Sequence, residues 1–262
     1  LANTVNSGFV GGVVGGILVG YLVIMTKKIQ IPKAFAGVMP ILIMPTVITL
    51  IAGLLMYYLF GYPIAWFMSA LTDMLTSLST ASRFIFGAII GAMMCADHGG
   101  PINKTAAMFV NGLNADGFII PTSAKMCSGM TAPLGIGLAC LFGSKKKFSP
   151  NDKEQGKSLV LLSCVYIQEG VIPFLVKDPI RVMVSTMTGG AITGGLCMTL
   201  GLGSPAVHGG LFVVPMTTNP LLFIGLWVLG GCITGTMYAI LKRPLPEGYV
   251  DDDDVLSPLD FG

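Results

Sequence analysis

The chain has little charge and only two histidines. Asp, Glu, Lys and Arg make up 11% of its 262 residues, whereas a soluble domain carries about 25% of these types. This scarcity excludes an ordinary soluble domain. The formal net charge of +2 is too small to indicate a nucleic-acid partner, and we expect none.

Paired cysteines and the common catalytic motifs are absent from the sequence as well. None of the six cysteines forms a CxxC pair or a Cys/His metal spacing, so we predict buried thiols with no disulfide, no metal site and no cofactor. The absence of HExxH and GxSxG argues against a membrane protease or a metal-dependent enzyme. The chain begins at Leu1 without the ordered regions of a signal peptide, and we therefore expect it to be part of a longer protein.

What the sequence does have is apolar residues, at 53%, with a mean hydropathy of +0.79. A membrane-spanning helix needs about 20 apolar residues, so we predict an all-α polytopic membrane protein with several transmembrane helices. Basic clusters at Lys27-Lys28, within residues 144–157 and at Lys242-Arg243 mark the cytoplasmic ends of these helices.

The order of segments predicts three parts. Residues 1–83 contain the first spans and an amphipathic stretch at 64–82, which we expect to be an interfacial helix. Residues 84–243 contain further apolar helices interrupted by polar sequence, including a turn-rich connection at 111–125. Residues 244–262 form an acidic tail, expected to be cytoplasmic.

Polar residues interrupt the apolar sequence at three places, which we call the first, second and third breaks: residues 97–104, 168–174 and 203–210. An ionisable group at membrane depth costs roughly 2.5–3.5 kcal/mol on insertion scales, so it usually faces a cavity and binds something. Gly and Pro in these segments indicate interrupted helices, which are tolerated only where the backbone is buried in protein or lines water. We therefore predict discontinuous or re-entrant helices that form the substrate site of a transporter.

Four segments in this order resemble the signature of a known family: Asp97–Lys104 (DHGGPINK), Glu169–Phe174 (EGVIPF), Asp178–Arg181 (DPIR) and His208–Gly210 (HGG). They are similar to the fructose-type enzyme IIC (EIIC) permease component of the bacterial phosphoenolpyruvate:sugar phosphotransferase system. The resemblance covers nearly the whole chain, to about residue 243. Two positions depart from it, because Gln168 stands where the family commonly has Thr, and His98 where it often has Met.

The resemblance implies a multi-pass permease of the bacterial inner (plasma) membrane, surrounded by lipid. It would import fructose or a fructose-like sugar, phosphorylated by enzyme IIB, a phosphocysteine donor supplied by the upstream phosphotransferase proteins. Relatives of related architecture are homodimers, with a scaffold domain and an elevator-type transport domain. The family usually has one or two further N-terminal spans, which this chain would lack. No residue resembles a phosphoryl carrier, so we expect the chain to act only as the membrane subunit of a phosphotransferase complex.

Glu169 is the candidate catalytic residue. By the resemblance and by its place in a break, its carboxylate would hold the sugar hydroxyl and take up its proton as the phosphoryl group arrives. The alternative is a structural carboxylate paired with Lys177 or Arg181.

Sugar hydroxyls need both acceptors and donors. The candidate substrate-binding residues that can supply them are Asp97, His98, Asn103, Gln168 and His208. A structural role is the alternative for each. We expect Lys104 to neutralise a carboxylate such as Asp97, and Asp178 and Arg181 to form an ion pair that steadies a turn.

Two other classes of protein remain open. An ion-coupled secondary transporter would use the same interrupted helices, with Glu169 or Asp97 as the coupling acid. A structural or receptor subunit of the membrane would leave the charged breaks unexplained. The order of the motifs favours the phosphotransferase permease.

Overall fold

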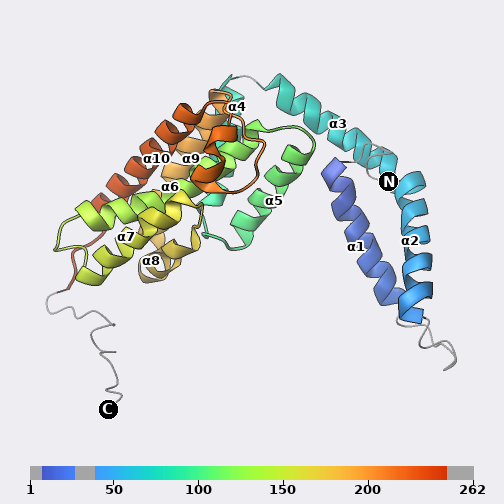
Figure 1. The fold of residues 1–262 in the computed structure, drawn as a ribbon, viewed down its shortest axis with the longest axis horizontal. Coiled ribbons are helices and arrows are strands. Elements are labelled where there is room, and N and C mark those ends of the chain that lie inside the picture. The colour runs from blue at the N-terminus through green and yellow to red at the C-terminus, as the bar shows by residue number, and fades with distance from the viewer. Residues whose placement is uncertain (1–7, 27–38, 79, 247–262) are drawn as a thin grey trace, which may run out of the picture. The chain divides into compact units, whose positions relative to one another are not determined.

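The computed structural model describes residues 8–26, 39–78 and 80–246 (Figure 1). All regular secondary structure in these residues is helical, which confirms the predicted all-α class. The predictions for Lys27-Lys28 and for the acidic end of the tail lie outside the described residues.

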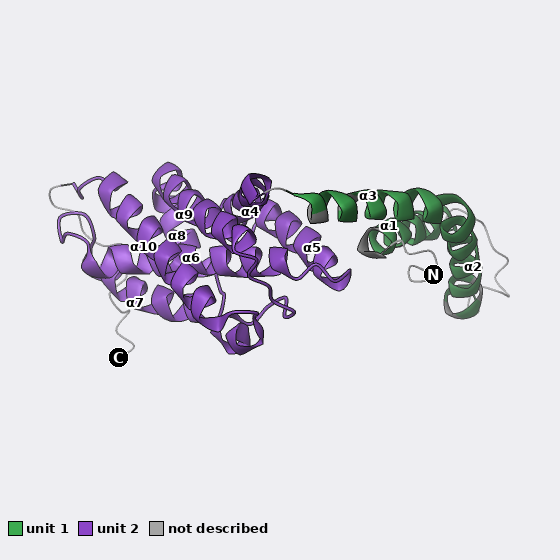
Figure 2. Cartoon of the chain, turned by 90° about the horizontal axis from the view of Figure 1, so that it is seen from above, with its two compact units in different colours: residues 1–78 green, residues 79–262 purple. Residues whose placement is uncertain are grey.

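The chain divides into two compact units, residues 1–78 and 79–262 (Figure 2). The first unit has a small apolar core around Met56, Ile64 and Met68. Its helices are α1 (Gly8–Thr26), α2 (Met44–Leu55) and α3 (Gly61–Ser77), with π-helical turns at Met39–Ile43 and Met56–Phe60.

The second unit contains the three breaks and the larger core. Most of its helices carry a proline in the first turn, where the missing N–H costs no hydrogen bond. Its elements are α4 (Thr80–Met94), α5 (Pro101–Ala115), α6 (Ile120–Phe142), α7 (Pro150–Cys164), η4 (Glu169–Val171), α8 (Ile172–Lys177), α9 (Pro179–Thr199), η5 (Gly210–Met216) and α10 (Pro220–Leu241).

Three helical stretches of the described chain are long and apolar enough to cross a membrane: Met44–Met74, Ile120–Phe142 and Pro220–Leu241. Two shorter apolar helices, Gly11–Thr26 and Thr80–Met94, accompany them. Nearly all of α6 is buried, and it packs against α7, α9 and α10. The outer helices expose large apolar side chains such as Leu221 and Ile180, as expected of a surface that faces lipid.

Close contact between α4 and α9 holds the end of α4 in place. Gly87 and Gly91 of α4 meet Gly194 and Gly190 of α9, and a Cβ at any of these positions would collide with the facing helix. Small residues four apart on both helices allow the two backbones to touch, which is a common basis of helix packing in membranes. The first break, directly after α4, is therefore attached to α9.

Two predicted boundaries within the second unit are wrong. The boundary at residue 84, where further apolar helices were expected to begin, falls inside α4, which begins at Thr80. Much of the expected polar connection at 111–125 is helical, because α5 continues to Ala115 and α6 starts at Ile120. The polar residues at the start of α6 are buried inside the protein, so their sequence carries no apolar signal although the backbone is helical.

Candidate functional site

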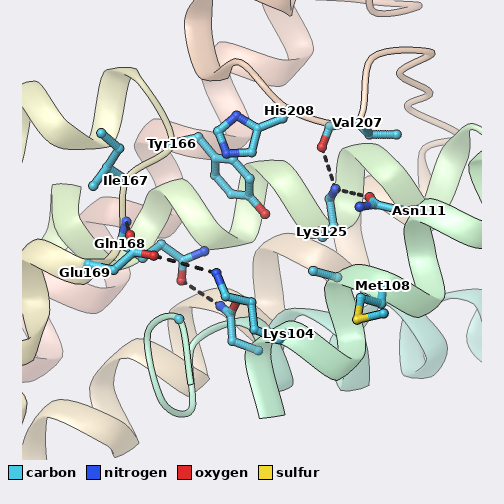
Figure 3. Close-up of a pocket in the computed structure, with 13 residues that line it drawn as sticks. Lys104, Met108, Asn111, Lys125, Tyr166, Ile167, Gln168, Glu169, Val207 and His208 are labelled. Carbon is cyan, nitrogen blue, oxygen red and sulfur yellow. Dashed lines mark hydrogen bonds and ion pairs between the residues drawn. The ribbon is translucent and has the colours of Figure 1, made fainter. Parts of the chain in front are cut away.

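A cavity of about 390 Å³ in the second unit is lined by residues from all three breaks and from α5 and α6 (Figure 3). Its size falls in the range of small-molecule sites, about 300–1,000 Å³. The polar lining residues are Asn103, Lys104, Asn111, Lys125, Tyr166, Gln168, Glu169 and His208. Four of the six candidate residues from the sequence, Asn103, Gln168, Glu169 and His208, therefore share one pocket.

Asp97, in the first break, lies outside this lining and caps α5. Its carboxylate accepts hydrogen bonds from the backbone N–H of Ile102 (2.7 Å) and of Asn103 (2.9 Å). These N–H groups have no partner within the helix, and a negative charge is favourable at a helix N-terminus. The absence of a Cβ at Gly100 leaves room for the carboxylate. The role of Asp97 in sugar binding stays a prediction.

His98 is fully buried and also lies outside the lining. Its Nε2 is 3.4 Å from the Thr186 hydroxyl of α9, and its Nδ1 has no hydrogen-bond partner among the described residues. The backbone of His98 has φ of 43°, a left-handed conformation that is uncommon outside glycine. The contact of His98 with sugar likewise stays a prediction.

Asn103 and Gln168 bring the first and second breaks together. The Asn103 side-chain amide donates to the carbonyl oxygen of Met94 (2.5 Å) and to Oε1 of Gln168 (3.2 Å). Both side chains are buried. Gly129 of α6 makes this arrangement possible, because a Cβ there would collide with Gln168 and Tyr166. The two amide side chains therefore have defined positions at the pocket wall.

Glu169 presents a half-exposed carboxylate, with 53% of its side chain accessible. Oε1 lies 3.8 Å from Nζ of Lys104, and Oε2 accepts a hydrogen bond from the backbone N–H of Gln168. The partner of Lys104 is thus Glu169 and not Asp97, the acid first expected. Exposed pairs of this kind contribute about 0–1 kcal/mol, so the carboxylate can exchange its partner for a ligand. The predicted Asp178–Arg181 ion pair is confirmed, at 2.8 Å.

His208, in the third break, packs against the aromatic ring of Tyr166. The ring centroids are 4.9 Å apart in an edge-to-face arrangement, and Tyr166 itself has a left-handed φ of 62°. Strained backbone of this kind persists only where the surrounding structure holds it. A neutral imidazole at this position can both donate and accept a hydrogen bond.

The pocket lining also includes Lys125, Asn111 and Tyr166, which no sequence motif indicated. Nζ of Lys125 donates to Oδ1 of Asn111 and to the carbonyl oxygen of Val207, both at 2.6 Å. Lys125 precedes the apolar part of α6 directly, and an ionisable group beside a span is itself a signal of function. The interpretation of residues 111–125 as a connection concealed that signal.

Helices long and apolar enough to span a membrane, together with broken segments that surround a polar cavity, are typical of membrane transporters. Residues 1–225 match the family model described as "Phosphotransferase system, EIIC". The "Fructose permease IIC component" of Bacillus amyloliquefaciens is 39% identical over 249 residues, which is 94% of this chain and 81% of the relative. The chain belongs to the EIIC family of the phosphotransferase system.

Longer relatives match over part of their length. The "PTS system fructose-specific EIIB'BC component" of Haemophilus influenzae is 41% identical over 214 residues, which is 82% of this chain and 38% of the relative. The protein of the same name from Escherichia coli is 40% identical over 224 residues, covering 84% of this chain and 40% of the relative. The chain thus spans about two fifths of the length of these relatives. No solved structure matches it significantly.

Proposed function

We propose that the chain is the sugar-translocating membrane part of a phosphotransferase permease, and that it imports fructose or a fructose-like sugar. One observation carries this proposal: side chains from three breaks far apart in sequence line a single polar cavity. Family membership and the names of the fructose-specific relatives support the substrate class. An ion-coupled secondary transporter, the alternative, finds no support among these relatives.

In the proposed reaction, enzyme IIB supplies the phosphoryl group from a phosphocysteine, and Glu169 receives the sugar hydroxyl. The P–S bond breaks, a P–O bond forms to the sugar, and the IIB thiolate leaves. The hydroxyl proton passes to the Glu169 carboxylate, which the weak pair with Lys104 leaves accessible. Gln168, Asn103 and His208 would orient the sugar through neighbouring hydroxyls. Fusion of EIIB and EIIC in the names of relatives supports the IIB partner.

We further propose a division of labour along the chain. Residues 84–243 would be the moving part of an elevator and residues 1–83 the scaffold and dimer contact, in the plasma membrane of a bacterium. Support comes from the separate cores of the two compact units and from the concentration of pocket residues in the second.

Everted membrane vesicles loaded with radiolabelled fructose test the proposal. Phosphoenolpyruvate, the general phosphotransferase proteins and enzyme IIB are added outside, at the cytoplasmic face. We expect labelled fructose phosphate in the medium, and none when IIB is omitted. Glu169→Gln should lower its rate about 100-fold or more, as removal of a proton acceptor does.

Glu154→Gln is the matched control, because Glu154 also faces a lysine, Lys157, at 2.6 Å, but on the exposed surface of α7. It should behave as wild type. Release of free fructose driven by an ion gradient would contradict group translocation and favour the secondary transporter. Unchanged phosphorylation by Glu169→Gln would exclude Glu169 as the proton acceptor.

A further inference from the structure

We propose that Lys125 is a second sugar-recognition residue, which donates a hydrogen bond to a sugar hydroxyl from the side of the pocket opposite Glu169. This inference rests on the function proposed above and goes beyond it in naming a specificity-determining residue. Figure 3 shows Lys125 with Asn111 on one side of the pocket, and Gln168, Glu169 and Lys104 on the other.

The hydrogen bonds of Lys125 leave one donor available. A lysine ammonium has three N–H groups. Two of them are directed to Oδ1 of Asn111 and the carbonyl oxygen of Val207, and the residue lines the cavity. The third N–H can therefore bind an oxygen atom of a ligand in the pocket.

Lys125 also has no counter-charge at ion-pair distance among the described residues. It is 2% exposed, yet none of the ion pairs formed by the described residues includes it. Lys104, the other lysine of the pocket, is 61% exposed and has Glu169 as its partner. A buried cation held only by neutral oxygens is costly, and such a group at membrane depth indicates function rather than stability.

Lys125 contacts several of the segments that form the wall of the pocket. It extends from α6 to α5 through Asn111 and to the third break through Val207, and its ammonium lies 6.0 Å from the centre of the Tyr166 ring. A sugar bound between Glu169 and Lys125 would meet an acceptor at one end and a charged donor at the other. A ligand that lacks the hydroxyl facing Lys125 would leave this buried donor unsatisfied, which discriminates strongly between substrates.

The test compares Lys125→Met with wild type in the fructose phosphorylation assay. We expect KM for fructose to rise about 10- to 100-fold, the usual weight of a hydrogen bond to a charged group. The maximal rate should stay within about threefold, because the proposed proton transfer at Glu169 is untouched. Lys147→Met is the matched control: Lys147 also donates two hydrogen bonds, in its case to the main-chain carbonyls of Ala239 and Ile240, but it lies away from the pocket.

A series of deoxyfructoses supplies a readout that a merely structural lysine would not change. Wild type should lose affinity for each analogue, whereas Lys125→Met should bind one of them as tightly as fructose, because the partner of that hydroxyl is already gone. If Lys125→Met does not fold, Lys125→Arg replaces it, and the planar guanidinium should raise KM while the maximal rate is kept.

The role of Lys125 would be overturned if the folded Lys125→Met variant kept the wild-type KM for fructose. It would also be overturned if the variant lost as much affinity as wild type for every deoxyfructose. Absence of fructose phosphorylation by wild type would instead contradict the proposed function, so the two failures are distinguishable.

Discussion

The first and second breaks contain the same kinds of residue but use them in different ways. Each has an acid near a polar neighbour, with glycine and proline following: Asp97-His98 in the first, Gln168-Glu169 in the second. Asp97 is directed to the backbone of α5, and His98 is buried against α9. Gln168 and Glu169 line the pocket.

The difference arises from where each acid stands relative to the next helix. The carboxylate of Asp97 reaches the free N–H groups at the start of α5, a helix of 15 residues. Glu169 stands at the start of a single 3₁₀ turn, and its carboxylate is directed to the backbone of Gln168 and to Lys104. The Asp97 carboxylate is thus engaged with the start of α5, whereas the Glu169 carboxylate is half-exposed in the pocket.

The largest effect is expected at the helix contact that holds the first break. Gly91→Leu places a side chain against the backbone of Gly190, which has no flexible end to move aside. We expect a loss of at least about 3 kcal/mol of folding stability, seen as little folded protein and a lower melting temperature in detergent. Gly16→Leu is the control, because no heavy atom lies within 4 Å of its Cβ position. Equal melting of Gly91→Leu and wild type would refute the packing argument.

A smaller and more selective effect is expected at the second break. Gly129→Ala adds a Cβ where Gln168 and Tyr166 now lie, so both must move although the fold can remain. We expect fructose affinity to fall about tenfold or more, because small displacements of binding groups are costly. Isothermal titration with fructose measures this. Gly225→Ala makes the same change where nothing lies within 4 Å and should bind normally. Normal binding by Gly129→Ala would show that the position of Gln168 is unimportant.

The smallest effect is expected for Asp97→Ala, and its comparison with Glu169→Gln separates the roles of Asp97 and Glu169. Asp97→Ala removes the cap of α5 and should lower stability by about 1 kcal/mol, with fructose affinity within about twofold of wild type. Glu169→Gln should show the reverse, with unchanged melting and lost phosphorylation. Thermal unfolding, sugar titration and the fructose phosphorylation assay, applied to both variants, make the comparison. If Asp97→Ala melted as wild type and lost affinity, the sequence-based role of Asp97 as a sugar ligand would be correct.

Much of the fold and part of the site could be predicted because their signals are local. Low charge, long apolar stretches and Gly/Pro interruptions indicate membrane helices with breaks. Glu169 and His208 could be predicted as site residues because they are polar groups in such breaks, and both line the pocket. Lys125 could not be predicted in this way, because the residues around it are polar and small. The structure shows that they form the buried start of α6.

Composition and ordered motifs are enough to predict the helical membrane class, the three polar breaks and the family, because they depend on no long-range contact. Which polar residues face a common cavity depends on how distant segments pack together. The hydrogen bonds of Asp97 join residues at most six positions apart, at the start of the next helix. The hydrogen bond of Lys125 to Val207 joins residues 82 positions apart. Packing of α4 against α9, possible because four glycines carry no side chain, holds the helix that leads into the first break, and the Asn103–Gln168 hydrogen bond joins that break to the second.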